Sequence, residues 1–399
     1  MNAWLGKPGV VCALGAGIDA VAAAALAGDT SGMRARTGWV RGRALTLGGY
    51  DGELPAIPDA LPAHHRSRNN QLLLAAALQI EAQLRGAVAR YGPGRVAVVL
   101  GTSTSGVNDN APAFGHLAAH GAWPADYDYR RQALSSPASF FADWLGVSGP
   151  AYTLSTACTS GARALLSARR LLELDLCDAV VCGGADTLCR LTINGFAALG
   201  AIDDGLCLPF SANRRGINIG EASALFLMAR DAAGSDGVAL LGGGASSDAW
   251  HMSAPEPTGA GARQAMQAAL ASAGLDAASV GWVNLHGTGT PHNDAMESHA
   301  MHAVFPQGVP CCSTKALTGH ALGAAGALEA ALAWATLSAS NAGARLIPHV
   351  WDGVPDPQLP ALEFSTPAHR YAPGRPRVAM SNSFAFGGNN VSLILGAQP

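Results

Sequence analysis

Short apolar runs alternate with longer alanine- and leucine-rich segments along most of the chain. The clearest apolar runs have the length and composition of strands, and they cover residues 95–100, 179–182, 224–228 and 391–395. The longer segments are rich in good helix formers, and they cover residues 71–90, 159–174, 260–273 and 321–338. Because strands that alternate with helices pack as sheets covered by helices, this pattern predicts a layered α/β fold.

Two pairs of segments resemble one another across the chain. TACTSGARALL (156–166) and TGHALGAAGAL (318–328) each place a polar turn before a helix of small residues. GEASALFLM (220–228) and GNNVSLIL (388–395) each place a polar turn before an apolar strand. We interpret these pairs as a duplicated fold with its boundary in 232–237, which gives halves of residues 1–235 and 236–399. Chance similarity between alanine-rich segments is the alternative.

Composition and charge narrow the class of protein. Of the 399 residues, 49% are apolar and 13% are charged, which favours a compact enzyme over a disordered chain. The formal net charge of −3 gives no signature of nucleic-acid or anionic-membrane binding. No basic start precedes a long apolar core, and no apolar run reaches the length of a membrane span. We therefore expect a cytoplasmic protein that binds neither nucleic acid nor membrane.

The eight cysteines include no CxxC pair and no zinc-like spacing. A disulfide framework is not expected in a chain of this length without a signal peptide. We predict that most of these cysteines are small buried hydrophobic residues and that they bind no metal.

Cys158 differs from the other cysteines because it stands where a polar turn gives way to a helix. A thiol there faces unpaired N–H groups and the positive end of the helix dipole, which favour the thiolate and could hold an oxyanion. His286 lies where a strand enters a glycine-rich turn, and His320 would cap the helix that mirrors the Cys158 helix, near a strand-borne Lys315. A buried inert cysteine and structural histidines are the alternative. The combination of Cys158 with His286, His320 and Lys315 favours nucleophilic catalysis.

Four motifs in order make the chain similar to a known family. TACTSG, HGTGTPHND, STKALTGHALGAAGALE and SNSFAFGGNN, with PFSANRRGINIGEA between the first two, resemble the type I and II beta-ketoacyl-acyl carrier protein synthases over residues 8–395. The resemblance implies the thiolase-type fold, a five-layer αβαβα sandwich made of two similar halves. It also implies an acyl carrier protein as partner and a homodimer, or a heterodimer with a related ketosynthase-like subunit, built through sheet pairing.

The resemblance assigns a role to each matching residue. Cys158 matches the acyl-accepting nucleophile, and His286 and His320 match the two catalytic histidines. Lys315 matches the lysine that supports the second histidine, and Glu329 the acid of the same network. Phe386 matches the gating phenylalanine, and its N–H would join that of Cys158 in the oxyanion hole, with Phe384 behind the gate. Thr288 and Thr290 match the threonines that hold the phosphopantetheine arm. Thr104 and Phe196 match positions far down the acyl tunnel.

Two further sites follow from the resemblance. Relatives present basic residues to an acidic carrier helix, and the matching positions here are Arg66, Arg68, Arg130 and Arg131. Some relatives hold a monovalent cation at positions that match Asn284, Glu329, Ser381 and Asn382, although the sequence leaves open whether one is bound here. The implied reaction, decarboxylative condensation of a cysteine-bound acyl group with malonyl-carrier protein, needs no metal or redox cofactor.

The chain departs from the family pattern in places. Residues 1–12 lack the usual long apolar first strand, so that edge is expected to be short. The contexts around Cys158 and in 186–196 look closer to synthases of aryl-polyene-type pathways than to those of fatty-acid synthesis.

Three rival functions stay open. They are a silent chain-length subunit, which usually lacks the nucleophile, a coenzyme A-dependent thiolase-like acyltransferase, which would show a second reactive cysteine in a carboxy-terminal turn, and a carrier-protein-binding scaffold without chemistry. In this chain that carboxy-terminal turn is FGGNN (386–390), without a cysteine.

Overall fold

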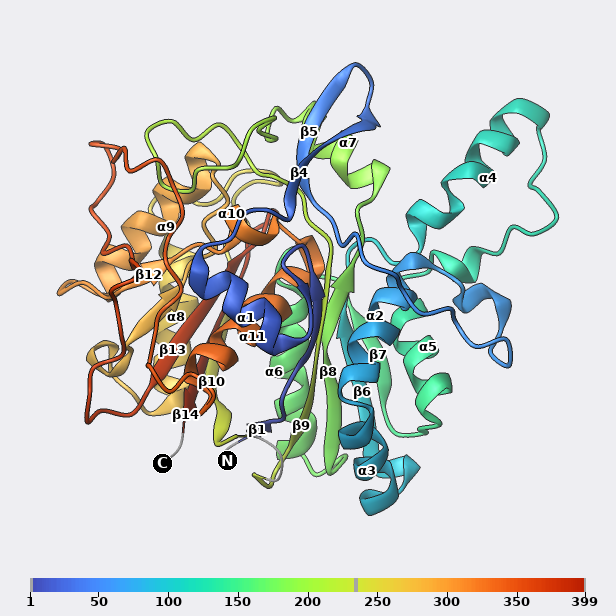
Figure 1. Cartoon of the computed structure of the whole chain (residues 1–399), viewed down its shortest axis with the longest axis horizontal. Coiled ribbons are helices and arrows are strands. Elements are labelled where there is room, and N and C mark those ends of the chain that lie inside the picture. The colour runs from blue at the N-terminus through green and yellow to red at the C-terminus, as the bar shows by residue number, and fades with distance from the viewer. Residues whose placement is uncertain (1–2, 233–235, 398–399) are drawn as a thin grey trace.

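The computed structural model describes residues 3–232 and 236–397, and most of its strands join in one long sheet (Figure 1). The amino-terminal part contributes β1 (Ala3–Leu5), β2 (Gly9–Cys12), β3 (Gly15–Ala16), β6 (Val96–Gly101), β7 (Ala151–Leu154), β8 (Ala179–Asp186) and β9 (Ala222–Ala229). The carboxy-terminal part contributes β10 (Val238–Ser247), β11 (Trp282–Asn284), β12 (Cys311–Cys312), β13 (Val378–Phe384) and β14 (Asn389–Ala397). A separate hairpin is formed by β4 (Met33–Val40) and β5 (Arg43–Gly48).

The two parts of the sheet have the same topology. From its outer edge, the amino-terminal part runs β7, β6, β8, β9 and then β1 or β2, while the carboxy-terminal part runs β12, β11, β13, β14 and β10. In each part the three outer strands are parallel and the later pairings are antiparallel. The short β1 pairs with both β9 and β10 and joins the parts. This equivalence confirms the predicted duplication. The boundary predicted in 232–237 includes residues 233–235, which lie outside the described residues.

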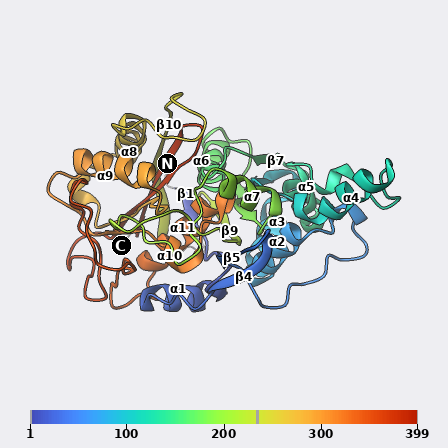
Figure 2. The same cartoon turned by 90° about the horizontal axis from the view of Figure 1, so that it is seen from above.

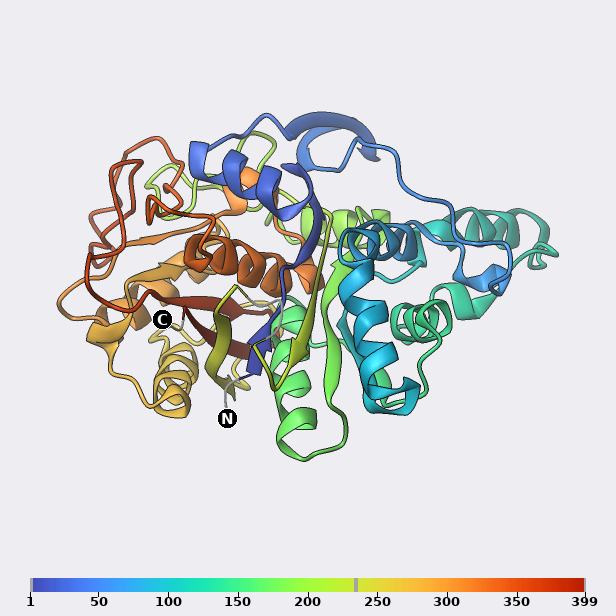
Figure 3. The same ribbon diagram turned by 60° about the horizontal axis from the view of Figure 1, so that its bottom comes forward.

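Helices fill three layers around the two parts of the sheet (Figures 1 and 3). The middle layer holds α6 (Ser160–Glu173) and α11 (Ala325–Leu337), the amino-terminal outer face carries α2 (Arg68–Gln79), α3 (Glu81–Tyr91) and α5 (Ser136–Leu145), and the carboxy-terminal outer face carries α8 (Ala260–Ala273) and α9 (Pro291–Val304). Other helices are α1 (Ile18–Ala27), α4 (Val107–His120), α7 (Arg190–Ala198) and α10 (Lys315–Thr318).

Alternating side chains tie each sheet to the helices on both of its faces. In β6, Ala97 and Val99 belong to the core that contains α6 and α11, whereas Val98 belongs to the core that contains α2 and α5. In β11, Trp282 points into the middle core and Val283 into the core under α8 and α9. Because successive side chains of a strand point to opposite faces, these contacts define five layers in the order αβαβα. The predicted thiolase-type architecture is confirmed.

The two middle helices approach closely at glycines. A methyl group on Gly326 would lie 2.8 Å from the Cβ of Ala162, and one on Gly161 would lie 2.8 Å from the backbone nitrogen of Ala327. Neither position therefore has room for a side chain. This contact brings the segments that precede α6 and α11 together, and these segments carry Cys158 and His320.

Three local predictions were wrong. The helix predicted over 71–90 is two helices, α2 and α3, which meet at an angle of 78° where Ile80 leaves the helical conformation (φ −122°, ψ 18°). This bend lets both helices bury apolar residues against the same outer core. Lys315 begins the short helix α10 and does not lie on a strand. His320 caps no helix, because the 3₁₀ turn η5 (Leu322–Ala324) separates it from α11.

The first strands β1 and β2 are short, as expected, but β1 is not an edge strand, because it pairs with β10 on one side and with β9 on the other. Among the described residues, no single helix is both long and apolar enough to cross a membrane, and only the bent α2–α3 pair meets that criterion when its members are counted together.

Candidate active site

Cys158 sits in a strained turn between β7 and α6. The residue before it, Ala157, has a φ of 52°, which is uncommon for a residue with a side chain. The Ala157 carbonyl accepts a hydrogen bond of 2.6 Å from the hydroxyl of Ser160, in the first turn of α6. Strain of this kind concentrates at functional sites, where the surrounding structure holds it in place. The thiol is buried, with 6% of the residue exposed.

His320 lies directly against this thiol. Its Nε2 is 3.0 Å from the Sγ of Cys158. The His320 backbone is fixed on both sides, since its N–H donates to the Asn218 carbonyl at 2.7 Å and its carbonyl accepts from Gly220 N–H at 2.9 Å. A methyl group at Gly220 would lie 2.3 Å from the Thr318 carbonyl oxygen, so only glycine allows this approach. The imidazole is therefore held at hydrogen-bonding distance from the nucleophile.

His286 completes a three-residue cluster. Its ring centroid is 5.2 Å from that of His320, and the two planes are nearly perpendicular at 83°. Its backbone leaves β11 and turns under α9, where the Glu297 carboxylate accepts from His286 N–H at 2.8 Å and from Gly287 N–H at 2.7 Å. Asp294, one turn earlier on α9, accepts from Thr288 N–H at 3.0 Å. Two buried carboxylates of one helix thus shape the histidine loop.

A buried ion pair supports the cluster from behind. Lys315 Nζ lies 2.6 Å from Glu329 Oε1, and both side chains are almost completely buried. The same ammonium group donates to the His286 carbonyl oxygen. Lys315 therefore joins α10, α11 and the histidine loop through its ammonium group. The predicted grouping of Cys158, His286, His320, Lys315 and Glu329 is present as one contiguous cluster.

Burial sets the protonation states of the cluster. It lowers the pKa of both His286 and His320 well below 6.5, and the positive charge of Lys315 lowers both further. It also raises the pKa of the Cys158 thiol to about 12, an effect that Lys315 only partly offsets. The resting site therefore holds a thiol and two neutral imidazoles, and the thiolate expected from the helix position alone is not favoured. His320 is placed to accept the thiol proton when Cys158 attacks.

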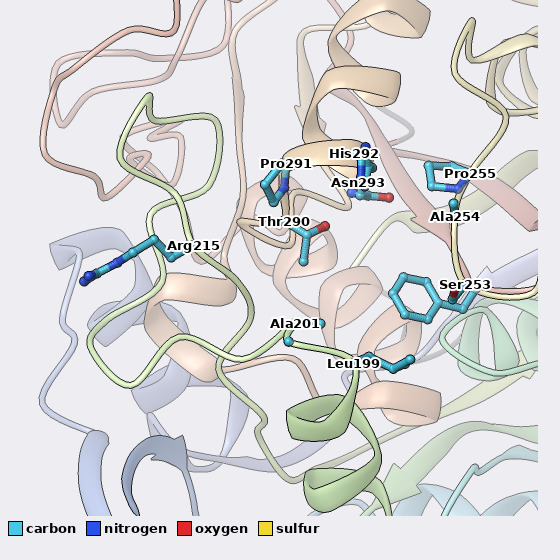
Figure 4. Close-up of a pocket in the computed structure, with 12 residues that line it drawn as sticks. Leu199, Ala201, Arg215, Ser253, Ala254, Pro255, Thr290, Pro291, His292 and Asn293 are labelled. Carbon is cyan, nitrogen blue, oxygen red and sulfur yellow. The ribbon is translucent and has the colours of Figure 1, made fainter.

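A pocket of about 380 Å³ opens at the residues that follow the histidine loop, and Cys158, His286 and His320 are not among its lining residues (Figure 4). Two of the predicted site residues, Thr290 and Phe386, line it together with Leu199, Gly200, Ala201, Arg215, Ser253, Ala254, Pro255, Pro291, His292 and Asn293. The hydroxyl groups of Thr288 and Thr290 lie 2.9 Å apart, so one donates to the other. Thr290 and the predicted gate Phe386 therefore share one opening, and Thr288 contacts it through the Thr290 hydroxyl.

Phe196 lies beside this gate. Its ring centroid, on α7, is 5.6 Å from that of Phe386. This contact places Phe196 beside the gate, and its position far down the acyl tunnel stays a prediction. Phe384, at the end of β13, is buried in the carboxy-terminal outer core with its ring 6.2 Å from that of His286. Phe384 therefore lies behind the His286 ring, and its position behind the gate stays a prediction.

Thr104 belongs to a buried hydrogen-bond network. Its hydroxyl donates to Asp186 at 2.8 Å and accepts from Thr187 N–H at 3.1 Å, and the residue is 1% exposed. The fully buried Asp186 carboxylate also accepts from Ser103 N–H and, across the two halves, from Gly323 N–H at 2.6 Å. The Thr104 hydroxyl therefore donates and accepts hydrogen bonds within the protein itself.

The four predicted docking arginines differ in their hydrogen-bond and ion-pair partners. Arg66 and Arg130 are exposed and pair with Asp59 at 2.8 Å and Asp128 at 2.7 Å. Arg131 donates to the Asn110 side-chain oxygen at 2.9 Å. Arg68 makes two bonds, of 2.6 and 3.0 Å, to the carboxylate of Glu221, which is 1% exposed. Arg68 thus neutralises a buried charge.

The residues matched to a cation site contain unpaired buried atoms. Both side-chain polar atoms of Asn284 and the second oxygen of Glu329 have no hydrogen-bond partner among the described residues. Asn284 and Ser381 face each other across the β11–β13 pairing. The Asn382 oxygen accepts from Ser392. Orphaned oxygens of this kind suit a hard monovalent cation, so the residues fit the implied group.

Sequence reasoning missed Asp186, Asp294, Glu297 and Arg215. Asp294 and Glu297 stand three residues apart, directly after the histidine loop, and this spacing on one helix face was a usable signal. Asp186 gives no local signal, because its partners come from distant segments. Arg215 lies at the edge of the pocket, as Figure 4 shows, with its side chain 77% exposed.

The layered duplication and the site together define a thiolase-type protein with a reactive cysteine beside two histidines. The family model for the beta-ketoacyl synthase N-terminal domain matches residues 63–233, and the model for the C-terminal domain matches residues 238–342. The chain therefore belongs to the beta-ketoacyl synthase family.

Individual relatives agree with this assignment. A chain in the structure of a ketosynthase (ApeO) in complex with its chain length factor (ApeC) from Xenorhabdus doucetiae is 46% identical with a TM-score of 0.92, and the match covers 100% of this chain and 98% of that one. The 3-oxoacyl-[acyl-carrier-protein] synthase 2 of Rhizobium meliloti (strain 1021) is 34% identical over 62% of this chain and 61% of its own length. The synthase of the same name from Synechocystis sp. is 35% identical, with 62% of each chain covered. The chain thus matches about three fifths of the length of these curated relatives.

Proposed function

We propose that this protein is a beta-ketoacyl-acyl carrier protein synthase that condenses a Cys158-bound acyl group with malonyl-carrier protein. The observation that carries this proposal is the 3.0 Å contact between Cys158 Sγ and His320 Nε2, with the His286 ring 5.2 Å from that of His320. A buried inert cysteine needs no such partner. A nucleophile with a raised pKa needs a base at this distance.

In the first half-reaction, Cys158 Sγ attacks the carbonyl carbon of an acyl thioester. The thiol proton moves to His320 Nε2, and the carrier thiol leaves with a proton. The backbone N–H groups of Cys158 and Phe386 are proposed to hold the oxyanion of the tetrahedral intermediate. The product is an acyl thioester on Cys158 and a free carrier thiol.

In the second half-reaction, malonyl-carrier protein loses carbon dioxide. The electron pair of the broken carbon–carbon bond remains on the α-carbon and the thioester oxygen as an enolate. Neutral imidazoles can donate to that oxygen and stabilise its charge, and the lowered pKa of His286 and His320 keeps both rings neutral. The α-carbon then attacks the Cys158 thioester, a new carbon–carbon bond forms, and Cys158 leaves as a thiolate that regains a proton.

Substrates are proposed to enter on the phosphopantetheine arm of the carrier protein through the pocket beside Phe386. Thr288 and Thr290 offer paired hydroxyl groups, and a pocket of about 380 Å³ is of the size that holds small organic groups. A monovalent cation held by Asn284 and Glu329 would neutralise the carboxylate oxygen that Lys315 leaves unpaired. The proposed domains are the two halves, 1–235 with the nucleophile and 236–399 with both histidines.

The presence of Cys158 beside His320 argues against a silent chain-length subunit and against a scaffold without chemistry. A thiolase-like activity has less support, because the carboxy-terminal turn at residues 386–390 holds no cysteine. For the pathway, the sequence context around Cys158 supports aryl-polyene-type synthesis. The likeness to a chain from a ketosynthase–chain length factor complex is consistent with that choice.

Intact-mass measurement after incubation with a panel of acyl-carrier proteins tests the proposal. One acyl group should add to the wild-type chain, and none to Cys158→Ala, whose melting temperature should change little because a small side chain is removed. The panel also reports which chain lengths and degrees of unsaturation load. Acyl label that persists on Cys158→Ala would reject Cys158 as the nucleophile.

A further inference from the structure

The Asp186 carboxylate, at the carboxy-terminal end of β8, is fully buried and has no step in the proposed mechanism. Its Oδ1 accepts hydrogen bonds from the hydroxyl groups of Thr102 and Thr104, at 2.6 and 2.8 Å, and from the N–H groups of Ser103 and Thr104, both at 2.8 Å. Its Oδ2 accepts from Gly323 N–H at 2.6 Å and shares Ser103 N–H at 3.0 Å. A buried charge that is bound so completely fixes the segments that supply its donors.

The two oxygens bind different halves of the molecule. Residues 102–104 follow β6 in the amino-terminal half, whereas Gly323 lies in η5 of the carboxy-terminal half, three residues after His320. The approach is close, because a methyl group on Gly323 would lie 2.7 Å from the Ser103 nitrogen and 2.8 Å from Asp186 Oδ2. Only glycine therefore allows this bond between the halves.

The same contact reaches the start of α6. A methyl group on Gly161, in the first turn of α6, would lie 3.0 Å from the Gly323 carbonyl oxygen. The Ser103 hydroxyl donates to the Ala157 carbonyl, directly before the nucleophile, at 3.4 Å. Figure 2 shows α6 and α11, the helices that follow the two turns, together in the middle of the molecule. Asp186 thus lies between the turn of the nucleophile and the turn of the proposed base.

The turns around Asp186 are strained. Ser105, Ala157 and Leu322 have φ values of 43°, 52° and 46°, in the left-handed region that residues with side chains rarely adopt. One of them stands after β6, one before α6 and one in η5. Such conformations persist only where the surrounding structure holds them. The Gly323 bond directly follows Leu322 and so holds η5 in its strained form.

We propose that Asp186 is a positioning residue that holds His320 Nε2 at reaction distance from Cys158 Sγ. Its carboxylate is bonded to the turn that follows His320, so it acts through that turn. The His320 backbone is already bound to residues 218–220. One anchor leaves a turn free to rotate, whereas a second anchor at Gly323 fixes its orientation. The inference rests on the proposed function only in taking His320 as the base for acyl loading.

Asp186→Asn tests this role, because an amide has the shape of the carboxylate but a single acceptor. The four donors at Oδ1 would keep the amide oxygen there, so the NH2 group would face Gly323 N–H and repel it. The maximal rate of Cys158 acylation by a small thioester should fall at least about tenfold, since misplacing a catalytic group by about 1 Å costs about 100-fold. The thioester concentration at half-maximal rate should stay the same. Time-resolved intact-mass measurement gives both values.

The charge change alone acts in the opposite direction. Burial and, to a smaller extent, the charge of Asp186 raise the pKa of the Cys158 thiol. Removing that charge would therefore favour the thiolate, so slower acylation has to come from geometry.

Two companion variants separate positioning from a general loss of structure. In the His320→Ala background, Asp186→Asn should change acylation less than about twofold, because its effect runs through the absent imidazole. Thr102→Val, the matched control, removes a donor at Oδ1 and leaves the Gly323 bond in place. It should lower the melting temperature without slowing acylation. Wild-type acylation by Asp186→Asn, equal slowing by it with and without His320, or equal slowing by Thr102→Val would overturn the inference.

Hydrogen–deuterium exchange gives a readout that does not depend on the reaction. Backbone N–H groups in residues 318–326 should exchange slowly in the wild-type chain and faster in Asp186→Asn, but not in Thr102→Val. The wild-type measurement tests the Gly323 bond even if a variant does not fold, and rapid exchange there would contradict the inference. Wild-type acylation by His320→Ala would instead contradict the proposed function, while the exchange data would still decide whether Asp186 holds the turn.

Discussion

The rings of Phe196 and Phe386 lie 5.6 Å apart, centroid to centroid, with their planes inclined by 51°. This contact joins α7 to the turn after β13. The turn continues through Gly387 and Gly388, whose φ values of 83° and 80° are closed to most other residues. A ring that rests on α7 and is followed by two such glycines can move as a unit, as a gate requires.

This contact predicts coupled effects of two substitutions. Phe386→Ala and Phe196→Ala should each change the rate at which acyl groups load onto Cys158. The double variant should differ from the product of the single effects by a few-fold, because an aromatic pair contributes about 1 kcal/mol beyond its buried area. Rates come from time-resolved intact-mass measurement. If the two effects on the loading rate are strictly multiplicative and Phe196→Ala alone accepts longer acyl chains, Phe196 lines the floor of the acyl tunnel and does not support the gate.

Loss of His286 should impair decarboxylation more than acylation by small thioesters. His286→Ala removes a donor to the proposed enolate, and this should slow carbon dioxide release from malonyl-carrier protein about 100-fold, or roughly 3 kcal/mol. His320→Ala should slow both half-reactions, because His320 Nε2 also contacts the Cys158 thiol. Carbon dioxide release and acyl loading are measured on the same preparations. Near wild-type condensation by both variants would contradict the mechanism.

The ion pair between Lys315 and Glu329 should be needed for stability as well as for activity. Lys315→Met leaves the buried Glu329 carboxylate without its cation and should lower the free energy of unfolding by about 3 kcal/mol. Lys315→Met/Glu329→Leu should recover part of that loss without restoring condensation, since His286 then lacks the ammonium group at its carbonyl. Chemical denaturation and condensation rates give the two readouts. If the double variant recovers the free energy of unfolding and the condensation rate equally, Lys315 has only a packing role.

The pH dependence of Cys158 should be that of a buried thiol. Because burial raises its pKa to about 12, the rate of alkylation by iodoacetamide should rise with pH without a plateau up to about pH 10. Because the pKa values of His286 and His320 lie well below 6.5, acyl loading should show no inflection near pH 6.5, and its acid limb should fall below that value. A pH-independent alkylation rate would indicate a thiolate–imidazolium pair instead.

The docking arginines should separate into two kinds. Arg66→Glu should raise KM for carrier-bound substrate, leave small thioester mimics unaffected and leave the melting temperature unchanged, because the ion pair of Arg66 is with the exposed Asp59. Arg68→Glu should lower the melting temperature, because it places a second carboxylate beside buried Glu221. Thermal melts and steady-state kinetics with both substrate types distinguish these effects. Equal losses with both substrates for Arg66→Glu would remove it from the docking surface.

Much of the fold could be predicted from the sequence because its signals are local. The helix predicted over 260–273 is α8 without change. The strand predicted at 179–182 is the first half of β8, and the strand predicted at 224–228 is the central part of β9. The break between α2 and α3 could not be predicted, because no proline or glycine marks Ile80. It follows from packing both helices on one outer core.

Part of the candidate site could also be predicted from the sequence, and part could not. Cys158, His286, His320, Lys315 and Glu329 stand in recognisable motifs, and their grouping was predictable before their contacts were known. The protonation state of Cys158 was not predictable from the sequence. Its position before a helix suggests a thiolate, whereas burial favours the thiol, and only the packed structure reveals that burial. Asp186 was also out of reach, since its bond to Gly323 joins residues 137 positions apart.

Cys158 and His320 occupy the same place in the two repeated segments, as the third residue of TAC and of TGH. A unit that associates with its own copy can only set identical side chains opposite each other at the symmetry axis. Covalent joining of the two copies removes that restriction, so one position can become a nucleophile while its counterpart becomes a base. In the joined chain the nucleophile Cys158 and the base His320 come from different halves and lie 3.0 Å apart. Neither half on its own contains both residues.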